Sequence, residues 1–143
     1  MKSIVVLVSG SGSNLQAIID NCNIKYINAE IKCVISNNPG AYALQRANSA
    51  NIDNIVINHK DYLSRDEFDN ELIKILDDLN PDLIVLAGFM RILTEKLTKK
   101  FKTIKENIIF CIDCPRSTIW RNIIYDKYKQ SRIKKDNYDI SPY

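Results

Sequence analysis

The sequence of 143 residues predicts a doubly wound α/β domain with a mainly parallel sheet. Strand-like and helix-like segments alternate through the first three quarters of the chain, and single helices between strands require right-handed crossovers. Two strand-like runs, 4–8 and 83–87, are apolar throughout, which is typical of strands buried on both faces. Ligands of such sheets bind beyond the carboxyl ends of the strands. We therefore expect residues 10–14, His59 and residues 88–93 to converge there.

Each element in the first half has its own signal. A β-branched run favours a strand, and the helical patterns that follow are separated from the strands by turn residues such as the NNPG sequence. The predicted order is a strand at 4–8, a helix at 14–22, a strand at 31–36, the turn at 37–40, a helix at 41–50 and a short strand at 55–57.

The second half begins with a capping box, in which Glu67 stands three residues after the candidate N-cap Ser64. The helix that follows ends before Pro81. It carries an apolar stripe that consists of Phe68, Leu72, Ile73, Ile75 and Leu76. The remaining predicted elements are a strand at 83–87, a basic helix at 94–102 and a fifth strand at 108–110.

The loop after the first strand has the composition of an anion site. It reads SGSGSN at 9–14, and it leaves backbone N–H groups at a helix N-terminus, where negative charge is favoured. Ser13 and Asn14 can cap the helix or bond a phosphate. Leu15 replaces the third glycine of the dinucleotide fingerprint, and no Gly-Lys-Ser/Thr follows for a Walker A loop. Phosphate binding and an ordinary capped turn both fit.

Composition limits the function classes. Hydrophobic residues make up 45% and charged residues 26%, as in soluble globular proteins. The apolar start is too short for a transmembrane span or a signal peptide, so we expect a cytoplasmic protein without a membrane partner. Residues 1–114 hold 13 basic and 14 acidic side chains, whereas 115–143 hold 7 and 3. We therefore expect no nucleic-acid partner for the folded part, and a basic tail that binds nucleic acid is the last-ranked alternative.

Two segments together resemble phosphoribosylglycinamide formyltransferases. One is 4–15, ending in SGSGSNL, and the other is PDLIVLAGFMRIL at 81–93. The segments SNN at 36–38 and SRDEFD at 64–69 are similar too, in the same order and spacing. The resemblance covers roughly the first 108 residues and is carried by the ordered set of motifs.

This resemblance implies a Rossmann-like formyltransferase fold and a step of purine (IMP) biosynthesis. A formyl group passes from the co-substrate 10-formyltetrahydrofolate to the amine of glycinamide ribonucleotide, without a metal. By position, Gly12, Ser13 and Asn14 would bind the substrate's phosphate. Gly88 would lie where the two ligands meet. The residues implied for the co-substrate are Arg65, Met90, Arg91, Ile92 and Leu93.

The residues themselves are compatible with this assignment. A flat pterin needs an apolar slot with a few fixed polar groups, which the segment 90–93 could form after a buried strand. Arg65 or Arg91 could attract the carboxylates of the co-substrate. From the residues alone, the alternative is that Met90, Ile92 and Leu93 are core and Arg91 is solvated.

The sequence departs from the family's pattern at the fifth strand. There the family has an Asn-x-His-Pro-Ser motif, which supplies an oxyanion donor and a group that moves protons. Counting without gaps from 90–93 leaves Asn107 as the catalytic candidate and puts Ile109 in the place of the histidine. We predict a formyltransferase N-terminal domain at 1–109 and a divergent basic tail at 110–143.

Two explanations of this departure stay open. One is a frameshift or truncation near residue 109, so that the fold ends after about the fifth strand. The other is a diverged module that binds a phosphate or nucleotide without catalysis. In a truncated fold, the sheet surface that the missing half should cover would be exposed, so we expect self-association through it.

His59 and the pair Cys111 and Cys114 invite other chemistry. His59 is the one histidine and follows the third strand, but no nucleophile pairs with it in the sequence, so a solvated loop histidine is favoured over a catalytic one. The CIDC sequence lacks a second pair of zinc ligands and the usual helix-start context of redox motifs. We therefore expect no metal.

Overall fold

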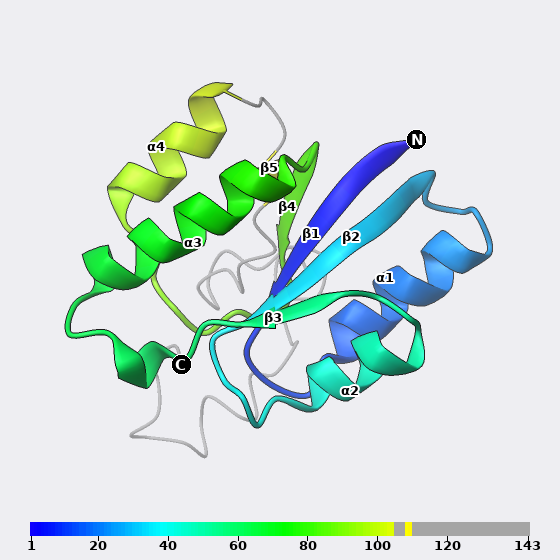
Figure 1. The fold of residues 1–143 in the computed structure, drawn as a ribbon. Coiled ribbons are helices and arrows are strands. Elements are labelled where there is room, and N and C mark those ends of the chain that lie inside the picture. Colours follow the sequence, from blue (N-terminus) through cyan, green and yellow to red (C-terminus); the bar gives the residue numbers. More distant parts are fainter. Residues whose placement is uncertain (105–107, 110–143) are drawn as a thin grey trace, which may run out of the picture. The chain divides into compact units, whose positions relative to one another are not determined.

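The strands form one parallel sheet in the order β3-β2-β1-β4-β5 (Figure 1). The computed structural model describes residues 1–104 and 108–109 of the chain. Its strands are β1 (Lys2–Val8), β2 (Ala29–Ser36), β3 (Asn54–Val56), β4 (Leu83–Leu86) and β5 (Ile108–Ile109). All four strand pairings are parallel, so the predicted doubly wound α/β class is confirmed.

The helices lie where the sequence predicts them, with ends that differ by at most two residues. They are α1 (Ser13–Asn23), α2 (Tyr42–Ser49), α3 (Arg65–Leu79) and α4 (Glu95–Ile104). A short 3₁₀ helix, η1 (His59–Asp61), was not predicted. It is stabilised by the side chain of Asn58, which accepts a hydrogen bond from the Lys60 N–H.

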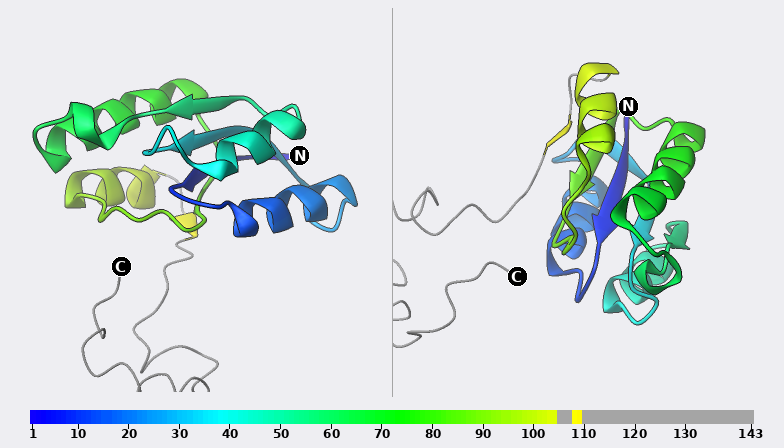
Figure 2. Two further views of the ribbon diagram at one scale, coloured as in Figure 1. Left: turned by 90° about the horizontal axis from the view of Figure 1, so that it is seen from below. Right: turned by 90° about the vertical axis from the view of Figure 1, so that its left-hand side faces the viewer.

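Two helix pairs cover opposite faces of the sheet (Figure 1). α1 and α2 pack on the face that carries Val6 and Val34, whereas α3 and α4 pack on the face that carries Leu7 and Ile35. The right-hand view of Figure 2 is taken from the side of α3 and α4, and these two helices lie in front of the sheet there. Successive residues of 5–8 in β1 and of 33–35 in β2 thus enter different cores, which explains why the run at 4–8 is apolar throughout.

The capping box of α3 differs in one bond from the expected pattern. Ser64 is the N-cap, and its side chain accepts a hydrogen bond from the Glu67 N–H at 3.2 Å. The Glu67 carboxylate turns back to the N–H of Leu63, at 3.1 Å, rather than to that of Ser64. Two backbone donors before and within the first turn are still satisfied, and the predicted stripe faces the core.

The order of the strands places a topological switch between β1 and β4. The chain adds β2 and β3 on one side of β1 and then returns to add β4 and β5 on the other side. Loops from neighbouring strands leave in opposite directions at such a point and open a crevice, where ligands of doubly wound sheets bind.

Several predictions lie outside the described residues. These are Asn107, the tail at 110–143 and its cysteines Cys111 and Cys114. Within the described part of the chain, no helix combines the length and apolarity that crossing a bilayer requires.

Candidate functional site

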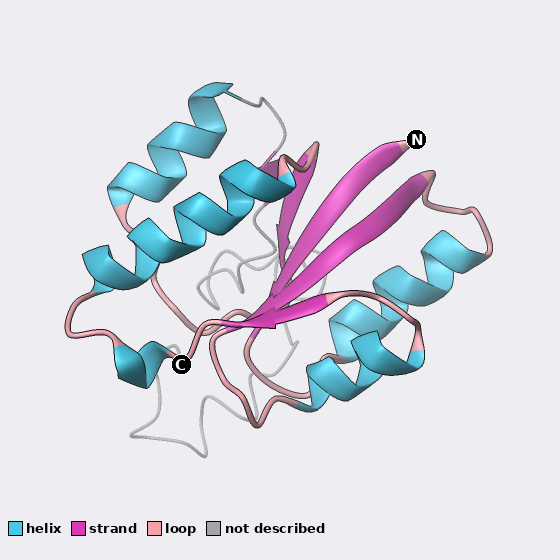
Figure 3. Ribbon diagram, viewed as in Figure 1, coloured by secondary structure: helices cyan, strands magenta, loops and turns pink. Residues whose placement is uncertain are grey.

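The candidate site lies at the end of the sheet where the loops after β1, β2 and β4 emerge (Figure 3). The loop after β1 carries Gly12, and the segment after β4 carries Gly88 and Met90. Both follow adjacent strands, because β1 pairs with β4 from Ile4 to Leu7. The structure therefore brings together the two sequence-predicted halves of the site at the switch point.

The loop after β1 ends in an uncapped helix N-terminus. Gly12 is the N-cap of α1, in a left-handed conformation with φ of 74°, and no side chain caps the helix. Ser13 and Asn14 are instead its first, exposed helical residues, so their predicted capping role is wrong. The capping position is that of the residue before the helix, whose side chain accepts from an N–H two or three residues later, and here a glycine occupies it.

The first turn of α1 therefore has backbone N–H groups without an acceptor in the described part of the chain. The N–H groups of Ser13, Asn14 and Leu15 form no hydrogen bond with the described part of the chain. The first intrahelical bond runs from the Gln16 N–H to the Gly12 carbonyl at 2.9 Å. These free donors, with the positive end of the helix dipole behind them, suit a phosphate group.

Only glycine fits at position 12. A Cβ there would lie 2.6 Å from the Cβ and 2.7 Å from the Cα of Ala43, on α2. The loop therefore passes as close to α2 as backbone allows, and its positive φ adds a second requirement for glycine. Gly88 also has a positive φ, of 69°, but nothing lies within 4 Å of the Cβ it lacks.

Ser9 links three strand ends through a buried hydroxyl. Its Oγ donates to Oδ1 of Asn37 at 2.6 Å and accepts from the Met90 N–H at 2.8 Å. The side chains of Ser9 and Asn37 are both buried. The bond to Met90 fixes the start of the segment 90–93 against the beginning of the loop at 9–14, which we name the anion loop after its predicted ligand. Neither Ser9 nor Asn37 is singled out as a site residue by the sequence pattern, although both are polar residues directly after apolar strands.

His59 is tied to the same network. Its ring Nδ1 lies 2.8 Å from the backbone carbonyl of Asn37, and its own N–H donates to that carbonyl at 3.2 Å. A carbonyl oxygen can only accept, so Nδ1 carries a proton in this arrangement. The ring holds the end of β3 close to that of β2, which is a structural role.

The segment after β4 is anchored at its other end by α3. The buried carboxylate of Asp69 accepts a hydrogen bond from the Thr94 N–H at 2.6 Å. The guanidinium carbon of Arg91 lies 4.1 Å from the centre of the Phe68 ring. Arg91 is thus half-buried against α3, so the alternative of a solvated Arg91 is wrong. Arg65 is exposed at the first residue of α3, one turn before Phe68.

Between these anchors the apolar side chains divide into two groups. Leu93 and Phe89 pack against the core under α3 and α4. Met90 and Ile92 are 65% and 70% exposed, so they are not core residues. Single exposed apolar side chains are common on protein surfaces, but two of them in one short, anchored segment are compatible with a ligand-binding surface.

Comparisons with known proteins agree with the motifs. The family model described as formyl transferase matches residues 2–108, which is most of the chain. The chain belongs to the formyl transferase family. The predicted resemblance is therefore confirmed at the level of the family.

Relatives of this formyl transferase family member cover the same region. The phosphoribosylglycinamide formyltransferase of Haemophilus influenzae is 50% identical over 101 residues, which are 71% of this chain and 48% of the relative. That of Escherichia coli is 48% identical over 92 residues, which are 64% and 43% of the two chains. The chain thus spans less than half the length of these bacterial relatives.

Solved structures show the same fold. The phosphoribosylglycinamide formyltransferase of Coxiella burnetii matches with a TM-score of 0.66 and 45% identity, over 70% of this chain and 47% of that one. Glycinamide ribonucleotide transformylase 1 of Symbiobacterium toebii matches with a TM-score of 0.74 and 34% identity, over 90% and 62%.

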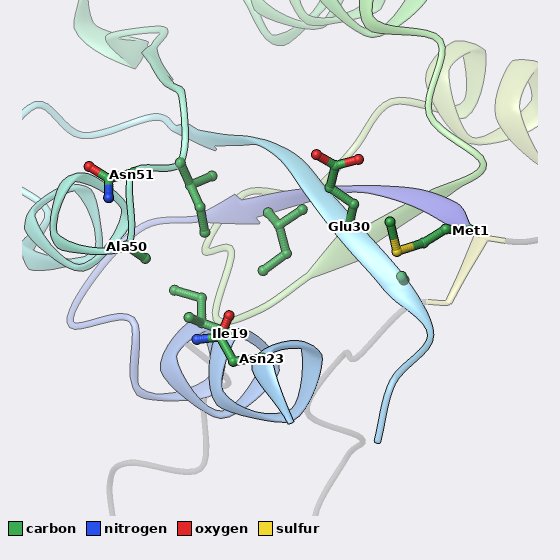
Figure 4. Close-up of a pocket in the computed structure, with 9 residues that line it drawn as sticks. Met1, Ile19, Asn23, Glu30, Ala50 and Asn51 are labelled. Atoms are coloured by element: carbon green, nitrogen blue, oxygen red, sulfur yellow. The ribbon is translucent and has the colours of Figure 1, made fainter. Parts of the chain in front are cut away.

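A hollow of about 320 Å³ lies away from this site, at the amino ends of the strands (Figure 4). Its lining includes Met1, Ile19, Glu30 and Asn51, none of which belongs to the family motifs. The described residues contain no group of three or more His, Cys, Asp and Glu side chains that could hold a metal ion.

The two cysteines within the described part both have environments that raise the pKa of the thiol. Burial and, to a smaller extent, the nearby Asp53 carboxylate raise the pKa of the Cys33 thiol to about 11, although the bond to the Val34 carbonyl lowers it. Burial also raises the pKa of Cys22. A raised thiol pKa keeps the nucleophilic thiolate scarce near pH 7.

Proposed function

We propose that this formyl transferase family member transfers a formyl group from 10-formyltetrahydrofolate to N1-(5-phospho-D-ribosyl)glycinamide, a step of de novo purine (IMP) biosynthesis. The proposal is supported by two relatives named as phosphoribosylglycinamide formyltransferases, which are 50% and 48% identical to this chain over the matched residues. The observation that carries it is the uncapped N-terminus of α1, whose open donors match a phosphate monoester. The proposal includes a cytoplasmic location.

On the substrate side, the backbone of Gly12, Ser13 and Asn14 would bind the phosphate. Their N–H groups need no side-chain rearrangement, because no side chain caps the helix. Gly88 would border the reacting groups, since the space next to its Cα is open. A glycine there leaves room for a ligand to approach the backbone.

On the co-substrate side, the residues present fit a flat apolar group with a charged tail. Met90 and Ile92 expose their side chains, and Leu93 packs beneath them against the core. Arg65 is exposed at the start of α3, and Arg91 lies on the Phe68 ring. These residues would hold the pterin and the carboxylates of 10-formyltetrahydrofolate, which supplies the formyl group.

Proton transfer is the step for which this chain lacks the expected residue. Attack of an amine on a formyl carbon needs a donor for the developing oxyanion and a group that moves a proton. An Asn107 amide can supply the donor. Ile109, in β5, has no proton to give. We therefore expect slow turnover, unless another group replaces the family's histidine.

The test combines binding and turnover on the full chain. Isothermal titration measures binding of glycinamide ribonucleotide, and absorbance follows release of tetrahydrofolate from 10-formyltetrahydrofolate. Binding with turnover supports the whole proposal. Binding without turnover would show a non-catalytic phosphate-binding module, and absence of binding by folded protein would reject both.

A matched pair of variants identifies the phosphate site. Asn14→Asp places a negative charge beside the open donors, and we expect the Kd for glycinamide ribonucleotide to rise at least tenfold. Asn23→Asp makes the same change at the last residue of α1 and should leave the Kd unchanged. An acidic residue in the first turn stabilises a helix, so weaker binding by Asn14→Asp cannot be ascribed to unfolding.

A further inference from the structure

Helix α2 braces the anion loop through three contacts. The Ala43 N–H donates to the Gly10 carbonyl at 3.1 Å, and Nε of Arg46 donates to the Ser11 carbonyl at 2.8 Å. Gly12 packs directly on Ala43. Successive loop residues are thus each held by α2.

These contacts determine where the loop's donors point. In a trans peptide the C=O and the next N–H point in opposite directions, and the described chain has no cis peptide bond. Because the carbonyls of Gly10 and Ser11 turn toward α2, the N–H groups of Ser11 and Gly12 turn away from it. Neither N–H bonds to the described residues. The Arg46 bond therefore helps to present a donor for a ligand.

Arg46 is itself held in place. Its Nη1 donates to Oε1 of Gln16 at 3.3 Å, and its guanidinium carbon lies 5.0 Å from the centre of the Tyr42 ring. Partners on α1, α2 and the loop restrict the side chain, so little rotamer freedom remains to be lost when the loop binds a ligand.

We propose that Arg46 is a positioning residue of the anion loop, which acts through its bond to the Ser11 carbonyl rather than through its charge. The inference rests on the proposed function, because it concerns the phosphate monoester that the loop would bind. It assigns to α2 a role in substrate binding, although α2 carries none of the residues that the family resemblance assigns to the substrate.

Two nearly isosteric variants separate the bond from the charge. In Arg46→Gln, the amide nitrogen lies as many bonds from the backbone as Nε does, so a neutral donor to Ser11 is kept. Arg46→Met has a methyl group there and keeps neither donor nor charge. We expect Arg46→Met to raise the Kd for glycinamide ribonucleotide about five- to tenfold and Arg46→Gln to stay within about twofold of wild type.

Lys32→Met is the matched control. Lys32 also donates a hydrogen bond from a cationic side chain to a backbone carbonyl, that of Leu79, at 2.6 Å. Its loss should leave the Kd unchanged. Equal losses in Arg46→Gln and Arg46→Met would show that charge matters and would overturn the proposal.

A measurement on the free protein distinguishes this proposal from the function it rests on. Amide hydrogen exchange and ¹⁵N order parameters report the order of Ser11, Gly12 and Ser13 without any ligand. We expect faster exchange and lower order in Arg46→Met, with rescue in Arg46→Gln. Unchanged amides in Arg46→Met would refute the positioning role. If wild type binds no glycinamide ribonucleotide, the proposed function fails, and these amides still decide the role of Arg46.

Discussion

Replacing Gly12 by alanine tests how closely the anion loop approaches α2. The new Cβ would lie 2.6 Å and 2.7 Å from the Cβ and Cα of Ala43, well inside ordinary contact distance. The Cα of Ala43 belongs to the backbone, so relief requires that the loop or α2 move. The backbone φ of 74° is also unfavourable for alanine.

The two effects can be given magnitudes. A left-handed conformation costs a non-glycine residue about 1–2 kcal/mol. Overpacking of a tight contact costs about 1–3 kcal/mol. The substitution should therefore lower the free energy of unfolding by about 2–5 kcal/mol, a large part of the total of about 5–15 kcal/mol for a small domain.

Two other glycines serve as matched controls. Gly88→Ala has the positive φ without the clash, so its cost should be about 1–2 kcal/mol. Gly10→Ala has neither, because its φ is outside the left-handed region and nothing lies within 4 Å, so it should be neutral or slightly stabilising.

Urea unfolding followed by circular dichroism measures the three variants at 25 °C, where equal m-values allow the midpoints to be compared. Equal costs for Gly12→Ala and Gly88→Ala would show that the contact with Ala43 contributes nothing. A cost for Gly10→Ala as large as that for Gly12→Ala would refute the reasoning altogether.

Three further substitutions probe the anchors and the core. Asp69→Ala leaves the Thr94 N–H without its acceptor and should destabilise by about 1–3 kcal/mol, with faster exchange of the Thr94 amide; an unchanged amide would contradict the anchor. Ser64→Ala removes the N-cap of α3 and should cost about 1 kcal/mol in the same urea assay, and no cost would mean that water replaces the cap. Cys33 has a pKa raised from 9.0 to about 11, so its contribution to stability is complete below pH 9 and is lost as the pH rises toward 11. Between pH 8 and 11, the free energy of unfolding of Cys33→Ala should fall less than that of the wild type, because alanine has no thiol to titrate. Parallel pH curves for the variant and the wild type would disprove this contribution of Cys33.

The fold could be predicted because its elements carry local signals. The buried strands β1 and β4 are apolar runs, and Ser64 marks the start of α3. Local signals fail where an element is short. The 3₁₀ helix at His59–Asp61 depends on a bond from the Lys60 N–H to the Asn58 side chain, and such polar turns have no periodicity to detect.

The site could be predicted only in part, because one part of it is a continuous segment and the other parts are contacts between residues far apart in the sequence. The anion loop is local, and its glycines and polar residues indicate it without any knowledge of the fold. The bonds from Ser9 to Asn37 and to Met90 join residues 28 and 81 positions apart. Predicting them needs the strand order, since only the adjacency of β1 to both β2 and β4 brings these residues together.

The anchors on either side of residues 90–93 support the proposal that exposed apolar side chains there belong to the co-substrate site. Ser9 binds the backbone at Met90, and Asp69 binds it at Thr94, so the segment is fixed at both ends by buried side chains from separate elements. Met90 and Ile92 thus expose their side chains from a segment whose backbone is held at both ends. Fixing a surface before a ligand arrives reduces the ordering cost of binding. The two bonds that order the segment would therefore lower the ordering cost of the proposed co-substrate site.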